Sequence, residues 1–179
     1  MTYTEQQFNL PEMPGLSAKQ IDVHLKLYAG YVKNVNALTP DVAPYRLAFE
    51  FNGMRLHELY FEALGGDGVM VEGTLKSAVE KQYGSFDAWL TEFKNIAMTR
   101  GIGWALLTFD AKTSTFHNVW VRDHEVGHLG DLRIIFALDV WEHAFMVDYV
   151  PSERVDYIAA VFQNLKWDVL EGRFVKALA

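Results

Sequence analysis

The sequence predicts an α+β fold in two parts: an N-terminal lobe made of an antiparallel α-helical hairpin, and a C-terminal lobe with a three-stranded antiparallel sheet and flanking helices. Two observations support this prediction. Apolar residues repeat at helical spacing through the first third of the chain, and three short apolar runs follow within residues 104–140. Helices and strands that occupy separate stretches of a chain are typical of the α+β class. We place the boundary between the lobes at residues 72 and 73.

The composition limits the class of protein. A chain of 179 residues, half of them apolar, can bury one sizeable core or two small ones that share an interface. The formal charge of −7 argues against a nucleic-acid partner. The absence of Cys excludes thiolate chemistry and leaves His, Asp and Glu as metal ligands. Without a transmembrane-length apolar run or a secretory leader, we expect a soluble cytoplasmic protein that does not contact a membrane.

The N-terminal lobe reads as an extended arm followed by two helices. Prolines and a glycine break any regular element within residues 1–16. Ser17 is a suitable N-cap for a helix that reaches Leu38, and residues 40–44 form a turn. A second helix then carries an apolar stripe that includes Leu47, His57 and Leu64, and it ends at Gly65-Gly66.

Two histidines lie on the apolar stripes of these helices. His24 follows the cap at Ser17 by seven residues, and His57 precedes Leu64 by seven residues. Because consecutive helices joined by a short turn pack antiparallel, the two levels coincide. The hairpin therefore presents two imidazoles at one height to whatever packs against it.

The C-terminal lobe begins with two helices, continues with three strands and closes with two more helices. Ser85 caps the second helix, which we expect to reach Gly101, and Ser152 is expected to cap the first closing helix. The first two strands are close enough to form a hairpin. The expected elements are a helix at 74–83, the helix after Ser85, strands at Trp104–Phe109, Thr115–Val121 and Ile134–Val140, and closing helices that end near Leu178.

The third strand ends in a cluster of polar and aromatic residues, Asp139-Val-Trp-Glu-His143. Carboxylates and imidazoles are tolerated in a core only when they are paired or bind a metal. An Asp and a His close together suit a first-row transition metal. Combined with the two histidines of the hairpin, they predict a three-His, one-Asp site formed by His24, His57, Asp139 and His143.

Two other metal chemistries compete with this interpretation. His124-Glu125-Val126-Gly127-His128 matches the H-E-x-x-H pattern of zinc peptidases, but that pattern needs a sustained helix, whereas this one follows a strand and is interrupted at Gly130. A two-His, one-carboxylate oxygenase would need only three of the four ligands. It would also need a pocket for an organic substrate, and nothing in the sequence indicates one.

Motifs along nearly the whole chain resemble, in the same order, those of the iron/manganese superoxide dismutases. The first ligand helix is similar in having a His followed by a Tyr-Val pair, and the sheet is similar in its Gly-Trp strand. The matching segments are His24-x6-Tyr31-Val32, Phe51–Phe61, Gly103–Leu107, Asp139–His143, Arg154–Tyr157 and Asn164–Asp168.

This resemblance implies an enzyme that disproportionates superoxide to dioxygen and hydrogen peroxide at one iron or manganese ion per subunit. It implies the same four ligands, His24, His57, Asp139 and His143. The other implied roles are Tyr31 at the mouth of the substrate channel, Trp104 and Trp141 as aromatic walls, Arg154 as a cation near the entrance, and Glu142 as the residue that reaches the partner subunit's ligand His. That last role implies a homodimer, from which a tetramer can also form. A non-catalytic relative that binds metal only for stability is the alternative.

The sequence also departs from the family. The family's solvent-bonding Gln is absent: Gly53 occupies its helical position and His124 its sheet position, so the resemblance implies that His124 bonds the metal-bound solvent. The His24-to-Tyr31 spacing is one residue shorter than is common, so the helix must lack a bulge or be rewound. No His–Tyr pair across the dimer is evident, because Leu27 or Tyr28 stands on one side and Met146 on the other.

Overall fold

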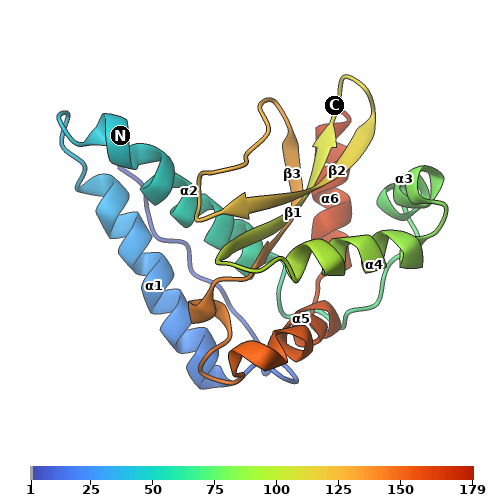
Figure 1. Ribbon diagram of the computed structural model, residues 1–179, viewed down its shortest axis with the longest axis horizontal. Helices are drawn as coiled ribbons and strands as arrows, with labels where there is room; N and C mark the ends of the chain where they lie inside the picture. The colour runs from blue at the N-terminus through green and yellow to red at the C-terminus, as the bar shows by residue number, and fades with distance from the viewer. Residues whose placement is uncertain (1) are drawn as a thin grey trace.

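The computed structural model describes residues 2–179, apart from the side chain of residue 45, and confirms the α+β class (Figure 1). The boundary between lobes at residues 72 and 73 stays a prediction. The elements in chain order are α1 (Ala18–Asn36), α2 (Ala43–Glu62), α3 (Thr74–Tyr83), α4 (Phe86–Ala97), β1 (Gly103–Asp110), β2 (Thr115–Arg122), β3 (Arg133–Asp139), the 3-10 helices η1 (Glu142–Ala144) and η2 (Pro151–Glu153), α5 (Arg154–Gln163) and α6 (Trp167–Ala177).

The first two helices form the predicted antiparallel hairpin (Figure 1). The Ser17 hydroxyl accepts a hydrogen bond from the backbone N–H of Gln20 at 3.0 Å, which satisfies one of the unpaired donors of the first helical turn. The buried positions of α1 then recur at helical spacing, so one face of this helix belongs to the core. The cap and the periodicity together account for α1 as the sequence predicts it.

The second helix differs from its prediction at both ends. Leu47 was expected in the core but is 46% exposed, because the first turns of α2 extend away from the sheet (Figure 1). The helix ends at Glu62, before Leu64. The predicted glycine stop follows there, and the backbone N–H groups of Gly65 and Gly66 both donate to the carbonyl of Asn164. This contact ties the end of the hairpin to the C-terminal helices.

The sheet has the strand order β2-β1-β3, and both pairings are antiparallel. The central strand, β1, is almost entirely buried, with α4 packed on β1 and β2 and with α6 and α2 packed on β3. Trp104 of β1 lies directly opposite Asp139 of β3. Side chains of directly paired residues project from the same face of a sheet. The register therefore brings these two residues to one level of the sheet.

The predicted cap of the first closing helix is wrong. Ser152 lies inside the short helix η2, and α5 begins only at Arg154. Pro151 favours a tight turn at this position, and the Glu153 carboxylate accepts from the backbone N–H of Val150 at 3.0 Å. The start of this segment is therefore stabilised by the Val150–Glu153 contact and not by the Ser152 side chain. Within residues 2–179, moreover, no helix combines the length and hydropathy that spanning a bilayer requires.

Candidate metal centre

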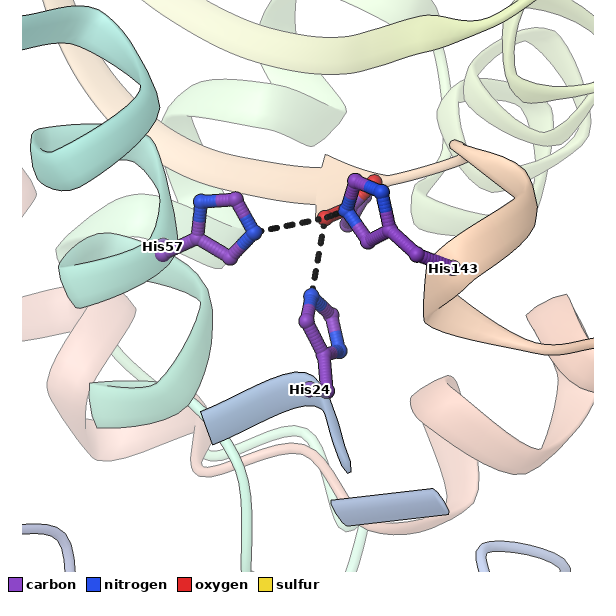
Figure 2. A group of neighbouring side chains, drawn as sticks. His24, His57 and His143 are labelled. Carbon is purple, nitrogen blue, oxygen red and sulfur yellow. Dashed lines mark hydrogen bonds and ion pairs between the residues drawn. The ribbon is translucent and has the colours of Figure 1, made fainter. Parts of the chain in front are cut away.

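The four predicted ligands come together between the helical hairpin and the sheet (Figure 2). His24 Nε2 and His143 Nε2 each lie 3.1 Å from Oδ2 of Asp139, and His57 Nε2 lies 3.4 Å from the same oxygen. One ligand atom from each residue lies within 4.8 Å of all the others. The cluster therefore has the size and the donor set of a site for one metal ion.

The two hairpin histidines face each other as their matched levels predict, with ring centroids 5.0 Å apart. The rings of Tyr60 and Phe61 pack against His24, at centroid distances of 5.3 and 4.9 Å. Both imidazoles have no solvent exposure, and burial lowers the pKa of each below 6.5, farthest for His57. Both therefore remain neutral and keep a lone pair available as a ligand at neutral pH.

A backbone hydrogen bond determines which nitrogen of His57 carries the proton. Nδ1 of His57 lies 2.5 Å from the carbonyl oxygen of Gly53, and a carbonyl only accepts, so Nδ1 holds the hydrogen. Nε2 is then a bare lone pair that faces a carboxylate oxygen. Two lone pairs at this distance repel unless a cation lies between them. The arrangement fits a metal ion, whose imidazole ligands commonly donate their other N–H in this way.

Asp139 occupies the last position of β3 and is fully buried. Burial alone would raise its pKa, but the facing imidazoles of His143 and His24 more than offset this and lower the pKa below its ordinary value. The carboxylate also accepts from the backbone N–H of Trp141 at 2.9 Å through Oδ1. Its backbone carbonyl accepts from the hydroxyl of Tyr157 at 2.7 Å. These bonds fix both the backbone and the side chain of Asp139. Its Oδ2 remains available to face the three histidines.

A second layer of hydrogen bonds lies beside the ligands and centres on His124. The indole N–H of Trp104 donates to His124 Nδ1 at 2.9 Å, so the proton of this neutral ring is on Nε2. Nε2 then donates to the hydroxyl of Tyr31 at 2.7 Å. Trp141 stacks on the rings of both His124 and His143. Both nitrogens of His124 thus have protein partners, and the hydroxyl hydrogen of Tyr31 is free for another acceptor.

Gly53, which the sequence places where the family has its helical Gln, also shapes this layer. A Cβ atom there would lie 2.6 Å from the ring of Tyr31, so only glycine lets that ring approach the helix. The same residue supplies the carbonyl that orients His57. A glycine inside a helix is unfavourable unless packing requires it, and that was the available signal. Tyr31 lies on α1, which is an unbroken α-helix. The short spacing from His24 to Tyr31 therefore corresponds to a helix without a bulge.

The remaining predicted residues are Glu142 and Arg154. Glu142 is exposed on η1 beside His143. The Arg154 guanidinium donates to the carbonyls of Ala97 and Gly101, at 2.5 and 3.1 Å, where α4 ends. Its charge therefore also complements the C-terminal end of the α4 dipole. The roles implied for Glu142 and Arg154 stay predictions.

The H-E-x-x-H segment does not form the helix that a zinc peptidase needs. Residues 123–125 form a turn after β2 that is closed by an isolated bridge between Arg122 and Val126, and Gly127 has a positive φ of 108°. His124 is buried, whereas His128 is exposed, and His128 Nε2 lies 2.9 Å from the backbone carbonyl of His124. The two imidazoles therefore do not present their nitrogens to a common point.

The fold and the site define an α+β protein, with an N-terminal helical region before a three-stranded sheet, and a candidate centre for one metal ion. Residues 71–173 match the family described as iron/manganese superoxide dismutases, C-terminal domain. A protein of Cupriavidus metallidurans named superoxide dismutase (Fe) is 35% identical over 93% of this chain and 92% of its own length. One of Haloferax volcanii named superoxide dismutase (Mn) 2 is 35% identical, with 84% and 82% covered.

The chain belongs to the iron/manganese superoxide dismutase family. It is an enzyme of the superoxide dismutase type, and neither the peptidase nor the non-catalytic alternative is favoured. The relatives also imply one metal ion, for which the four-residue cluster offers a site.

Replacing Asp139 by Ala is expected to abolish metal binding and dismutation, because the cluster loses its one anionic donor. Metal content after purification and activity after reconstitution with iron or manganese measure the two effects. His117→Ala, which removes an exposed imidazole on β2, is the matched control and should retain both. Full metal occupancy in Asp139→Ala would contradict the assignment.

The pKa of His124 predicts a pH dependence of stability. Burial lowers this pKa from 6.5 to about 4. Between these values the unfolded chain binds a proton that the folded chain does not, so the free energy of unfolding falls as the pH falls from 6.5 towards 4. Urea unfolding of wild type and His124→Gln at pH 7 and pH 5 isolates the contribution. The variant should lose less stability over this range, by no more than about 1.4 kcal/mol per pH unit. Parallel losses in both proteins would contradict the prediction.

Proposed function

We propose that the protein disproportionates superoxide at one iron or manganese ion per subunit, held by His24, His57, Asp139 and His143. The observation that supports this most directly is the bare Nε2 lone pair of His57 facing Oδ2 of Asp139. When bound, the metal supplies a one-electron change between its trivalent and divalent states, which zinc cannot supply. The ligand set suits either ion, and relatives bear the names of both.

The charge of the ligand set favours an anionic substrate. One carboxylate and three neutral imidazoles leave a trivalent ion with a net positive charge, so superoxide is attracted locally although the whole chain carries −7. The packing of Trp104 and Trp141 around the imidazoles keeps water from screening that charge. The positive charge that attracts superoxide is therefore confined to the metal centre.

Disproportionation of two superoxide ions consumes two protons, and Tyr31 is the residue we assign to hold one near the substrate. Its hydroxyl accepts from His124, so its own hydrogen is available to a third group. Burial, and then the charge of Asp139, raise the pKa of Tyr31, so the hydroxyl stays protonated at neutral pH. Trp104 and His124 fix the direction of these bonds, so His124 acts on the centre through Tyr31 and not by a direct bond to metal-bound solvent.

His124→Ala is expected to leave the metal bound, to shift its redox potential and to lower turnover by about 10–100-fold, as outer hydrogen-bond partners of metal sites typically do. Metal content, a redox titration and steady-state turnover measure the three effects. The exposed His128→Ala serves as the control and should match wild type. A zinc peptidase would instead lose its metal in both variants and cleave peptides in the parent. Turnover of His124→Ala equal to wild type would refute the assigned role.

We also propose a homodimer in which Glu142 reaches the partner subunit's His143. Glu142 is exposed next to a ligand, and the residues that follow, Met146 and Val147, are apolar and exposed by 50% and 40%. An isologous contact at this face would place the two centres near the two-fold axis. Tyr28 faces its own lobe, where it donates to Glu58 and accepts from the backbone N–H of Gln6, so it is not placed to pair across the dimer.

Glu142→Ala should weaken the dimer and lower activity together, because one residue serves both the interface and the ligand. Sedimentation velocity and activity over a dilution series measure the two properties in the same samples. Glu125→Ala removes an exposed carboxylate from the turn after β2 and should change neither. A fully active Glu142→Ala monomer would contradict the proposal.

A cytoplasmic location completes the proposed function. The chain has no Cys, so its stability does not depend on disulfides and it suits a reducing compartment.

A further inference from the structure

Gln20 is a fully buried amide on α1, one turn before the ligand His24, with a relative exposure of 0%. The nitrogen and the oxygen of this amide both form hydrogen bonds with the segment 143–147. Nε2 donates to the backbone carbonyl of His143 at 2.7 Å, and Oε1 accepts from the backbone N–H of Val147 at 3.0 Å. A buried amide is stable only when its polar atoms have such partners. The Gln20 amide and the segment that carries the ligand His143 therefore satisfy each other's hydrogen-bonding groups.

The two backbone groups that Gln20 bonds would otherwise bond each other. The carbonyl of His143 and the N–H of Val147 are separated by four residues, which is the spacing of an α-helical hydrogen bond. Among the described residues, the backbone bonds of this segment join other pairs, such as Met146 N–H to the carbonyl of Glu142 and Tyr149 N–H to that of Phe145. The side chain of Gln20 is inserted where the direct bond would close a helical turn. The turn is held open, and its geometry depends on the amide.

We infer that Gln20 is a positioning residue for His143, an inference that rests on the proposed metal site. By holding the 143–147 turn open, it sets the direction in which the His143 imidazole meets Asp139. Because Gln20 and His24 share one face of α1, the same contact couples a ligand of the helical lobe to a ligand of the sheet lobe. The distance between these two ligands is thus set by side-chain bonding and not by packing alone.

The test replaces Gln20 by Met, which has a similar length but cannot bond either backbone group. In the metal-loaded enzyme, the absorption and electron paramagnetic resonance spectra should change, because the direction of one imidazole ligand changes. Metal loss to a chelator, at a temperature well below unfolding, should accelerate by about 10–100-fold. If Gln20→Met does not fold, Gln20→Glu takes its place, since it retains the acceptor for Val147 but loses the amide donor to His143.

Asp148→Ala is the matched control. Asp148 Oδ2 accepts from the backbone N–H of Ser17 at 2.7 Å, so it also ties α1 to this segment, but it does not bond a ligand residue. The control should lose stability in thermal unfolding yet retain the wild-type spectra and rate of metal loss. If Gln20→Met behaves like Asp148→Ala, with lowered stability and wild-type spectra, Gln20 only ties the lobes and the inference is overturned. If wild type itself holds no metal at these ligands, the proposed function fails instead.

Discussion

Most of the structure around the centre follows from one constraint, the burial of an ionised carboxylate at the end of a strand. The Asp139 side chain has no contact with solvent, and its Oδ2 lies within 3.4 Å of three imidazole nitrogens. An isolated charge is not tolerated in this environment, so the elements packed around Asp139 must bring compensating groups to it. The hairpin contributes two histidines, η1 contributes one, and α5 reaches the backbone of the same residue through Tyr157. The contact between the hairpin and the sheet is therefore organised around a single charge.

The sequence predicted those features that follow from local periodicity. The stripes of α1 and α2 placed His24 and His57 at one height, and the polar end of an apolar strand identified Asp139. Contacts that join side chains to distant backbone atoms were not predictable. Gln20 reads in the sequence as an ordinary polar residue of a first helical turn, because its partners lie more than a hundred residues away. Ser152 shows the converse case, in which a good local cap is displaced by the geometry of a neighbouring proline.

The imidazole of His124 differs from a glutamine amide in a way that matters for proton transfer. An amide can rotate so that its donor and acceptor exchange places, whereas a neutral imidazole with one nitrogen occupied by an indole N–H has only one arrangement of its proton. Trp104 is such a donor, and its position is fixed because β1 is the central strand. The direction of the hydrogen bonds from Trp104 through His124 to Tyr31 is therefore built into the sheet. Gly53 extends this control to the second helix, since it determines where the ring of Tyr31 can lie.

The burial of three donors has a kinetic consequence. His24 and Asp139 are 115 residues apart in the chain, so the donor set exists only once the helical hairpin and the sheet have packed together. In the folded protein, His24, His57 and Asp139 have no solvent exposure, so an incoming ion would reach these three donors through local opening between the hairpin and the sheet. Exchange of one ion for another is then limited by that opening and not by affinity alone. Both the binding and the loss of an ion at these buried donors therefore depend on how often that part of the structure opens.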